Sequence, residues 1–343
     1  MKRLAASLLA ALLLAGCQRT PAVREYTFLA FGTLVELKVA GADPALAERA
    51  RALAGRRLEE WHHEWNAWHD SPLTRLNEAL ARGETVPVPP SLTGLLPRAA
   101  ALSKRSDGLF NPAIGGLIGL WGFHSDDPPQ GPPPDDEAIR RLLESAPSMD
   151  DLDFAGGRVS SSNPALALDL GGFAKGVAVE RLTAQLAGMG LDDLLLNAGG
   201  DLKVLGSHGD RPWRVGIRDP RGKGVLASVE PRSGEAVFTS GDYERYFTWR
   251  GRRYHHLIDP RTGHPARGAV SVTVIANDAG LADAAATALF IAGPGQWPPI
   301  AARLGVDRVM LVRDDGRVEM TAAMAGRVRF QKEPAPPVTI RKP

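Results

Sequence analysis

The order of predicted strands and helices in the second half of the chain constrains the fold most strongly. Strands are expected at 165–170, 194–196, 202–206, 213–218, 225–230, 235–239, 245–250, 253–258 and 269–276. Helices are expected at 173–188, 281–292 and 296–304, and a hairpin closes the pattern at 307–321. A parallel sheet needs a crossover, usually a helix, between successive strands. Because most of these strands follow one another directly, we expect an α+β fold, with antiparallel sheets and helices packed on one face.

The first half of the chain begins with a β-rich segment and continues with helices. Residues 26–39 alternate, which places Val35, Leu37 and Val39 on one face of a half-buried strand. Asp43-Pro44 then has the chemistry of a helix start, with an N-cap followed by proline.

Three tryptophans, Trp61, Trp65 and Trp68, lie along this helix and just after it. Helical spacing of aromatic residues is more typical of a core than of a stacking surface. Trp68, at the helix end, is the residue of this group that we expect to lie outside the core.

Residues 1–17 have the features of a bacterial lipoprotein signal peptide. A charged start precedes an apolar run at 4–15, which is shorter than the roughly 20 residues that span a bilayer. Small residues precede Cys17, the only cysteine of the sequence. This arrangement resembles a lipobox and implies acylation of Cys17; the alternative is an ordinary signal peptide with an incidental cysteine. Gln18 favours the outer membrane, so we expect a periplasmic domain that a lipid anchors to the membrane.

The remaining boundaries follow from composition. Residues 18–25 are expected to form a tether, 26–322 the folded domain, and the Pro-rich 323–343 a loose tail. The net charge is only +2 and no basic run is interleaved with aromatic residues, so nucleic acid is not an expected partner.

The stretch from Tyr254 to Pro265 joins a strand to a rigid turn and is rich in histidine. Pro260 pre-sets φ, and Gly263 can supply a positive φ. A histidine at a strand end, with an unperturbed pKa near 6.5, suits proton transfer. The alternative is a hairpin whose histidines are only solvated.

The segment Asp169-Leu170-Gly171-Gly172-Phe173-Ala174-Lys175-Gly176 lies where an expected strand meets a helix. Its glycines permit close backbone approach, and a helix N-terminus suits phosphate. The spacing matches neither the dinucleotide fingerprint nor the Walker loop. A phosphate site and a plain helix start with a surface lysine therefore both stay open.

Asp283 and Thr287 lie four residues apart and share one helix face. With a nearby backbone carbonyl they would form a hard oxygen site suited to Mg²⁺, although Asp283 could instead be a helix cap. Asp201 and Asp242 lie in polar, glycine-bearing turns that either line a site or are ordinary β-turns.

Seven segments together resemble the ApbE family of flavin transferases, the FAD:protein FMN transferases. In chain order they are Phe-Gly-Thr (31–33), Leu-Trp-Gly-Phe (120–123), Asp-Leu-Gly-Gly-Phe-Ala-Lys-Gly (169–176), Asn-Ala-Gly-Gly-Asp (197–201), Ser-Gly-Asp-Tyr-Glu-Arg-Tyr-Phe (240–247), His-His-Leu-Ile-Asp-Pro-Arg-Thr-Gly (255–263) and Asp-Ala-Ala-Ala-Thr (283–287). The resemblance extends over about residues 26–322 and implies a T-fold-like duplicated core. It further implies Mg²⁺-dependent transfer of FMN from the substrate FAD to a threonine of a partner flavoprotein in a membrane redox complex, with release of AMP.

The resemblance also assigns roles by motif position. His256 matches the catalytic base, while the carbonyl of Gly172, the carboxylate of Asp283 and the hydroxyl of Thr287 match metal ligands. A larger set matches FAD-contacting positions, namely Phe31, Trp68, Leu109, Phe110, Asn111, Asp169, Lys175 and Ile258.

Two positions depart from the family pattern. Ala286 stands where many members have a second acid, so the metal site would have one fewer charged ligand, and Asn111 stands where Asp is common. Two other functions stay open from the sequence: an FAD-binding or FAD-hydrolysing lipoprotein without protein-transfer activity, and an assembly factor that acts by contact.

Overall fold

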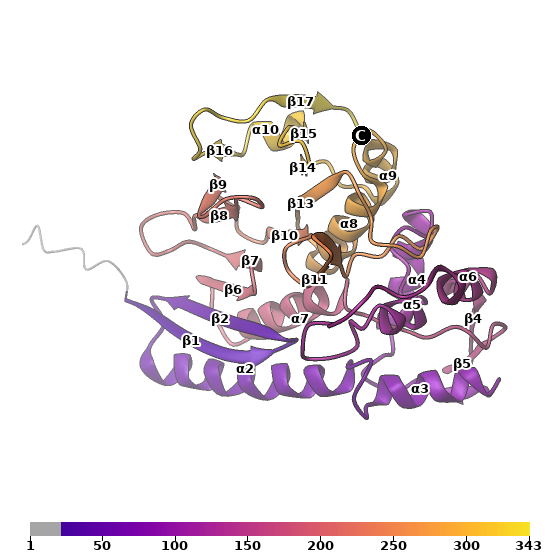
Figure 1. The fold of residues 1–343 in the computed structure, drawn as a ribbon. Coiled ribbons are helices and arrows are strands. Elements are labelled where there is room, and N and C mark those ends of the chain that lie inside the picture. Colours follow the sequence, from indigo (N-terminus) through magenta and orange to yellow (C-terminus); the bar gives the residue numbers. More distant parts are fainter. Residues whose placement is uncertain (1–21) are drawn as a thin grey trace, which may run out of the picture.

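The computed structural model describes residues 22–343 (Figure 1). The predicted signal peptide 1–17 and the first residues of the predicted tether lie outside the described residues. Strand β1 begins at Val23, so the expectation of a tether through residue 25 is wrong, because residues 23–25 pair with 38–40 of the next strand. Within residues 22–343, no helix combines the length and the apolar character needed to cross a membrane.

A nine-stranded sheet forms the centre of the molecule. Its strands in spatial order are β1 (Val23–Ala30), β2 (Thr33–Ala40), β6 (Leu194–Ala198), β7 (Asp201–Leu205), β10 (Ala236–Gly241), β13 (Ala269–Ala276), β14 (Val309–Arg313), β15 (Val318–Thr321) and β17 (Val338–Arg341). Neighbouring strands are antiparallel except β15 and β17, which pair in parallel. The expected antiparallel α+β fold is confirmed.

Three smaller sheets surround the central one. They are β11 (Tyr246–Trp249) with β12 (Arg252–His255), then β16 (Arg329–Phe330), β9 (Val225–Val229) and β8 (Val215–Arg218), and finally β3 (Val86–Pro87), β5 (Arg158–Ser161) and β4 (Leu152–Ala155). The helices are α2 (Pro44–Glu64), α3 (Pro72–Ala81), α4 (Leu95–Arg105), α5 (Gly115–Leu120), α6 (Asp136–Glu144), α7 (Ala174–Gly188), α8 (Ala279–Ala292), α9 (Trp297–Leu304) and α10 (Ala322–Ala325), with a 3₁₀ turn at Met149–Asp151.

The two faces of the central sheet are buried in different ways. Val35, Leu37 and Val39 are fully buried in the core that includes the helices, which confirms their predicted face. The opposite face of the sheet packs against β8, β9 and α10, through residues such as Val204 and Met310. Figure 1 shows α2 running along the β1–β2 hairpin, with α7 beside it.

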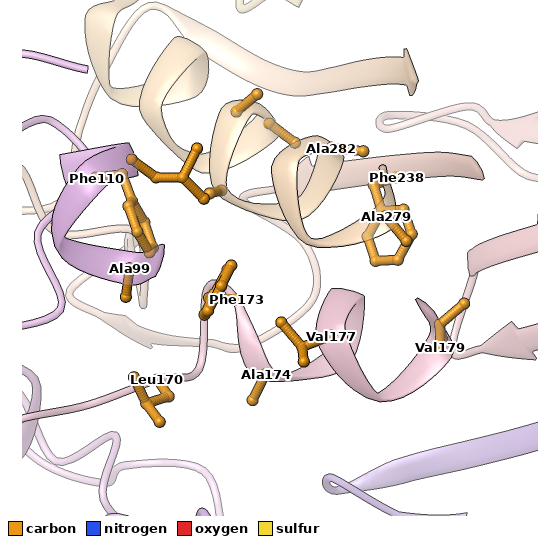
Figure 2. Close-up of a cluster of buried hydrophobic side chains, with 14 of the residues drawn as sticks. Ala99, Phe110, Leu170, Phe173, Ala174, Val177, Val179, Phe238, Ala279 and Ala282 are labelled. Carbon is orange, nitrogen blue, oxygen red and sulfur yellow. The ribbon is translucent and has the colours of Figure 1, made fainter. Parts of the chain in front are cut away.

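Helices α7 and α8 cross in direct contact. A Cβ atom at Gly176 would lie 2.5 Å from the carbonyl oxygen of Ala279 and 2.8 Å from Cβ of Asp283, so only glycine permits this approach. Figure 2 shows Phe173 and Val177 directed from the α7 segment toward α8. The contact fixes the start of α7 against the second turn of α8, where the predicted metal ligand Asp283 lies.

Two further sequence expectations are wrong. Residues 165–170 form no strand; Ala167 and Asp169 hydrogen-bond to the loop at 112–115, with a single bridge between Ala167 and Ile114. Their apolar pattern reflects burial of Leu166, Leu168 and Leu170 rather than a place in a sheet. The segment 323–343 is not a loose tail either, because it contains β16 and β17 and supplies the last strand of the central sheet.

Glu319 on β15 connects this last strand to the core. The carboxylate is almost fully buried and accepts hydrogen bonds from Arg341 at 3.0 Å, Trp297 Nε1 at 3.0 Å and the Gly295 amide at 3.0 Å. Burial alone would raise the pKa of Glu319, but these donors lower it to about 2. Replacing Glu319 with alanine leaves the buried Trp297 Nε1 without an acceptor and removes the ion pair to the part-exposed Arg341, so we expect the unfolding free energy to fall by about 2 kcal/mol at pH 7, measured by urea denaturation.

The loss caused by Glu319→Ala should depend on pH in a defined direction. A carboxylate with a lowered pKa stabilises the fold above its unfolded pKa, near 4.5, and this contribution disappears as the pH falls toward about 2. The difference between wild type and variant should therefore shrink below pH 4.5. Glu60→Ala, which removes an exposed ion pair with Arg57, is the control and should change stability by less than about 1 kcal/mol. An equal effect of the two substitutions would contradict the assignment.

Candidate functional site

A cavity of about 430 Å³ opens where the β1–β2 turn, the start of α7, the second turn of α8 and the end of β12 meet. This volume is in the range of small-molecule sites. All of the sequence-predicted site residues line it, namely Phe31, Trp68, Leu109, Phe110, Asn111, Asp169, Gly172, Lys175, His256, Ile258, Asp283 and Thr287. The structure therefore brings into one place residues that are spread over most of the chain, while their individual roles stay predictions.

Asp169 precedes α7 and is held from two sides. Its Oδ1 accepts the Gly171 amide at 2.7 Å, and its Oδ2 lies 2.8 Å from His124 Nε2. Burial alone would raise the pKa of Asp169, but His124 and the Gly171 amide outweigh burial and keep the pKa below its usual value. Asp169 is thus an anion that shapes the turn at the cavity wall. His124 was not predicted from sequence.

Lys175, in the first turn of α7, forms an ion pair with Asp201 at the start of β7. Burial would lower the pKa of Lys175, but Asp201, Glu244 and Asp283 raise it above its usual value, so the ammonium stays charged. Asp201 also accepts the Thr239 amide at 2.8 Å through its other oxygen. The reading of Lys175 as a plain surface lysine is therefore wrong, and the turn candidate Asp201 belongs to the site.

Asp283 is not the cap of α8, because Asp278 fills that role and accepts the Leu281 amide at 2.7 Å. Instead, Asp283 Oδ2 accepts the Gly176 amide at 2.8 Å across the helix contact. Burial has the largest effect on Asp283 and, together with the negative charge of Asp201, raises its pKa to about 7. The ammonium of Lys175 opposes this rise.

The other two predicted metal ligands lie beside each other. A Cβ on Gly172 would lie 3.1 Å from Thr287 Oγ1, so the main chain of the turn that precedes α7 lies next to the Thr287 hydroxyl on α8. Thr287 Oγ1 is also 3.3 Å from Ser240 Oγ on β10. The two helices thus present a hydroxyl and a main-chain turn to the cavity that Asp283 lines.

The two adjacent histidines have different environments. His255 is buried, with Nε2 2.9 Å from the Ala266 carbonyl and Nδ1 accepting the Leu257 amide at 3.3 Å, so it holds the turn together. His256 lines the cavity, and its Nδ1 lies 3.2 Å from the Arg245 carbonyl. A carbonyl only accepts, so Nδ1 carries the proton and Nε2 keeps its lone pair. Burial, followed by His255 and Arg245, lowers the pKa of His256 to about 3, which keeps the imidazole neutral.

The turn after His256 is held by Asp259. Its carboxylate binds Arg261 at 2.8 Å, and its main-chain oxygen accepts the Gly263 amide at 2.8 Å. Ile258, directly before Asp259, forms a bridge to Pro265 and is buried. Local turn chemistry thus fixes the end of the segment that carries His256.

An aromatic wall of Phe31, Trp65 and Trp68 forms another side of the cavity, and Trp61 packs behind it. Trp61 and Trp65 are buried and stack at 5.5 Å, and Phe31 stacks on Trp65 at 6.2 Å. Trp68 is only partly buried and stacks on His124 at 5.8 Å. The prediction that Trp61 and Trp65 are core and Trp68 is the exception is confirmed.

Phe31 has a strained backbone, with φ of 54° in the hairpin turn, and its amide donates to His62 Nδ1 at 3.1 Å. Positive φ in a non-glycine residue often marks a functional position. This hairpin-turn conformation, together with the stacking on Trp65, places the aromatic ring of Phe31 at the cavity.

Asn111 has a structural task that an aspartate would perform less well. Its amide nitrogen donates to the Pro147 carbonyl at 2.9 Å, and its oxygen accepts the Ala113 amide at 3.0 Å. An aspartate could accept but not donate. Leu109 and Phe110 before it are buried, and Phe110 packs against Phe173 at 5.9 Å.

Sequence reasoning missed Glu244 and Arg245, which line the cavity, and kept Asp242 as a candidate. Asp242 is instead bound by Arg221, with bonds of 2.7 and 2.6 Å, away from this cavity. Glu244 and Arg245 lie in the segment Ser240–Phe247, so the motif marked the region but not the correct acid. A strand that continued through residues 242–244 would place Asp242 and Glu244 on the same face, and the two side chains separate only because β10 ends at Gly241.

The sequence model of the ApbE family matches residues 31–310. This chain belongs to the ApbE family. The ApbE chain described here is 46% identical over 340 residues to a FAD:protein FMN transferase of Rhodobacter capsulatus, which covers 97% of this chain and 65% of that protein's length. It is 36% identical over 339 residues to the FAD:protein FMN transferase of Treponema pallidum, covering 91% of each chain. The crystal structure of the ApbE protein of Thermotoga maritima superposes with a TM-score of 0.80 at 32% identity, over 91% of this chain and 100% of that one.

Proposed function

We propose that this ApbE-family chain is a FAD:protein FMN transferase that moves FMN from FAD to a threonine hydroxyl of an acceptor protein and releases AMP. The observation that carries the proposal is the convergence of seven separate family segments on one cavity, which presents an ammonium, a neutral histidine and several oxygen donors. Relatives that cover nearly the whole chain bear the name of this activity.

The residues present fit the chemistry of phosphoryl transfer. This chemistry depends on charge neutralisation and in-line positioning more than on covalent catalysis. Lys175 would neutralise the FAD pyrophosphate from the first turn of α7, whose N-terminus is also favourable for phosphate. Phe31 and Trp68 would hold the ring systems of FAD by stacking.

His256 would act as the general base. The threonine Oγ attacks the phosphorus of the FMN phosphate, and its proton passes to Nε2 of His256. The bond from that phosphorus to the bridging oxygen breaks, and AMP leaves with the bond electrons. The Arg245 carbonyl holds the tautomer that this step requires.

The site also fits Mg²⁺, through the Asp283 carboxylate, the Thr287 hydroxyl and the Gly172 carbonyl, which are the hard oxygen donors that this ion prefers. Within residues 22–343 no group of three or more His, Cys, Asp or Glu could hold a metal, so the proposed site depends on these mixed donors. The raised pKa of Asp283 reflects burial and the nearby carboxylate of Asp201, and the negative charge of these two carboxylates would favour a bound cation. When bound, Mg²⁺ would neutralise charge on the pyrophosphate.

The direct test incubates the purified protein with FAD, Mg²⁺ and a threonine-bearing acceptor flavoprotein from a membrane redox complex. We expect mass spectrometry to find FMN esterified to one acceptor threonine, in step with AMP release. A threonine-to-valine acceptor is the matched control and should stay unmodified. Formation of AMP and free FMN without an adduct would contradict the transferase and leave an FAD hydrolase.

The cellular location is part of the same proposal. Cys17, outside the described residues, is proposed to carry lipid that anchors the domain in the periplasm, with the outer membrane favoured by Gln18. An anchor before Val23 would hold the domain at a membrane surface facing the periplasm. Mass spectrometry of the N-terminal peptide tests this directly, because an unmodified Cys17 in the mature protein would contradict it.

A further inference from the structure

Arg245 lies at a junction between two sides of the cavity. It follows β10 and precedes β11, and its Nη2 donates to the carbonyl oxygens of Phe123 and Ser125, each at 2.8 Å. Phe123 and Ser125 belong to the segment after α5, which is more than 100 residues away in sequence. The guanidinium therefore ties that segment to the strand connection that carries Arg245.

The same guanidinium supports the aromatic wall. It lies 5.7 Å from the centre of the Trp68 ring, within the range of a cation–π contact. Trp68 stacks on His124 with an interplanar angle of 22°, and His124 Nε2 lies 2.8 Å from Asp169 Oδ2. A continuous series of contacts thus runs from Arg245 through Trp68 and His124 to the turn before α7.

The main chain of Arg245 reaches the opposite side of the cavity. Its carbonyl oxygen accepts the His256 amide at 3.1 Å and lies 3.2 Å from His256 Nδ1. The position of this carbonyl decides both where the imidazole lies and which nitrogen is free. A displacement of Arg245 would therefore move Trp68 and His124 on one side of the cavity and His256 on the other.

We propose that Arg245 is a positioning residue that holds two parts of the cavity in one geometry: the series of contacts Trp68–His124–Asp169 on one side and His256 on the other. An arginine suits this task because one planar guanidinium donates to two carbonyls and stacks on a ring at the same time, which a lysine ammonium does not do. The inference rests on the proposed function for its kinetic consequence, whereas its consequence for FAD binding can be measured without an acceptor.

A double-variant cycle on FAD binding tests the inference. Arg245→Ala and Trp68→Ala are each expected to weaken FAD binding about tenfold, followed by quenching of FAD fluorescence. Because Arg245 acts through Trp68, the double variant should lose far less than the roughly hundredfold product of independent effects. Arg250→Ala is the control, since that guanidinium lies over Trp249, outside the cavity, and should leave binding unchanged. Losses that multiply in the double variant would overturn the proposal.

The kinetic arm uses Arg245→Lys, which keeps a cation near Trp68 and also covers the case in which the alanine variant fails to fold. We expect FAD binding within about threefold of wild type but a kcat for transfer about tenfold lower, because the carbonyl that orients His256 is less firmly held. Equal kcat for Arg245→Lys and wild type would overturn the proposal. A wild-type protein that binds FAD but transfers no FMN would contradict the proposed function alone, and the binding cycle would still decide on Arg245.

Discussion

Replacing His256 with glutamine should lower kcat for FMN transfer by about 10²–10⁴-fold, the usual contribution of a positioned general base. Glutamine is polar and of similar length, but it cannot accept the threonine proton. The loss should fall on kcat rather than on FAD affinity, because the pyrophosphate is expected to contact Lys175 and the start of α7 instead. Single-turnover kinetics with saturating FAD and acceptor measures the chemical step directly.

The pH profile gives this prediction a second readout. The pKa of His256 is lowered to about 3 by burial and nearby cations, so its neutral, proton-accepting form is present throughout the physiological range. A rise in activity between pH 5 and 8 should therefore not come from this histidine. His264→Gln, on the exposed side of the same turn, is the control and should keep full activity. A His256→Gln variant that keeps kcat within about threefold of wild type would rule out the general-base role.

The sequence predicted those parts of the fold that depend on local periodicity. The face formed by Val35, Leu37 and Val39, the helix start at Asp43 and the strand 269–276 all occur as expected. Each depends on the spacing of apolar residues or on a helix-capping residue, and both are visible in the sequence itself. The candidate residues came from short motifs whose types and order along the chain resemble the ApbE family.

The pairings that complete the site could not be predicted, because they join distant parts of the chain. His124 meets Asp169 across 45 residues, and Arg245 meets Phe123 across 122. No periodic pattern encodes either contact. Asp242 and Glu244 are two residues apart in one motif, yet only Glu244 lines the cavity, since the chain turns at the end of β10.

The prediction for the C-terminal segment 323–343 was wrong for a different reason. Its prolines suggested a loose tail, yet Val338–Arg341 forms β17 and pairs in parallel with β15. The stabilising partner is Glu319, whose buried carboxylate binds Arg341 at 3.0 Å. Composition describes only average behaviour. Here the ion pair between Arg341 and Glu319, together with the strand pairing to β15, is enough to order a proline-rich segment.

Asp283→Asn should reduce Mg²⁺-dependent transfer at least about 100-fold at limiting metal, since the variant loses the charged ligand. Asparagine has nearly the same shape, and its side-chain oxygen can still accept the Gly176 amide that Asp283 now binds at 2.8 Å. The contact between α7 and α8 should therefore survive, with thermal stability close to wild type. A Mg²⁺ titration of transfer rate, with Tm recorded in parallel, separates lost metal binding from lost folding.

Position 286 supplies the contrasting substitution. Ala286 is 1% exposed and belongs to the core of α8 rather than to the residues that line the cavity. An aspartate there would bury a carboxylate without a partner, so Ala286→Asp should lower Tm and leave the metal dependence of the folded fraction unchanged. The family's second acid is thus not simply restored by substitution, because its surroundings in this chain are apolar.

The pH dependence decides whether Asp283 acts as an anion. Burial raises its pKa to about 7, and Mg²⁺ binding requires the deprotonated form, so at limiting Mg²⁺ the transfer rate should rise with pH up to about 7 and level off above it. Added Mg²⁺ competes with the proton and should move this rise to lower pH. Asp283→Asn, which has no proton to lose, should abolish the rise. If wild type and Asp283→Asn share the same pH profile and the same Mg²⁺ titration, the metal site must be sought elsewhere in the cavity, among Asp201 and Glu244.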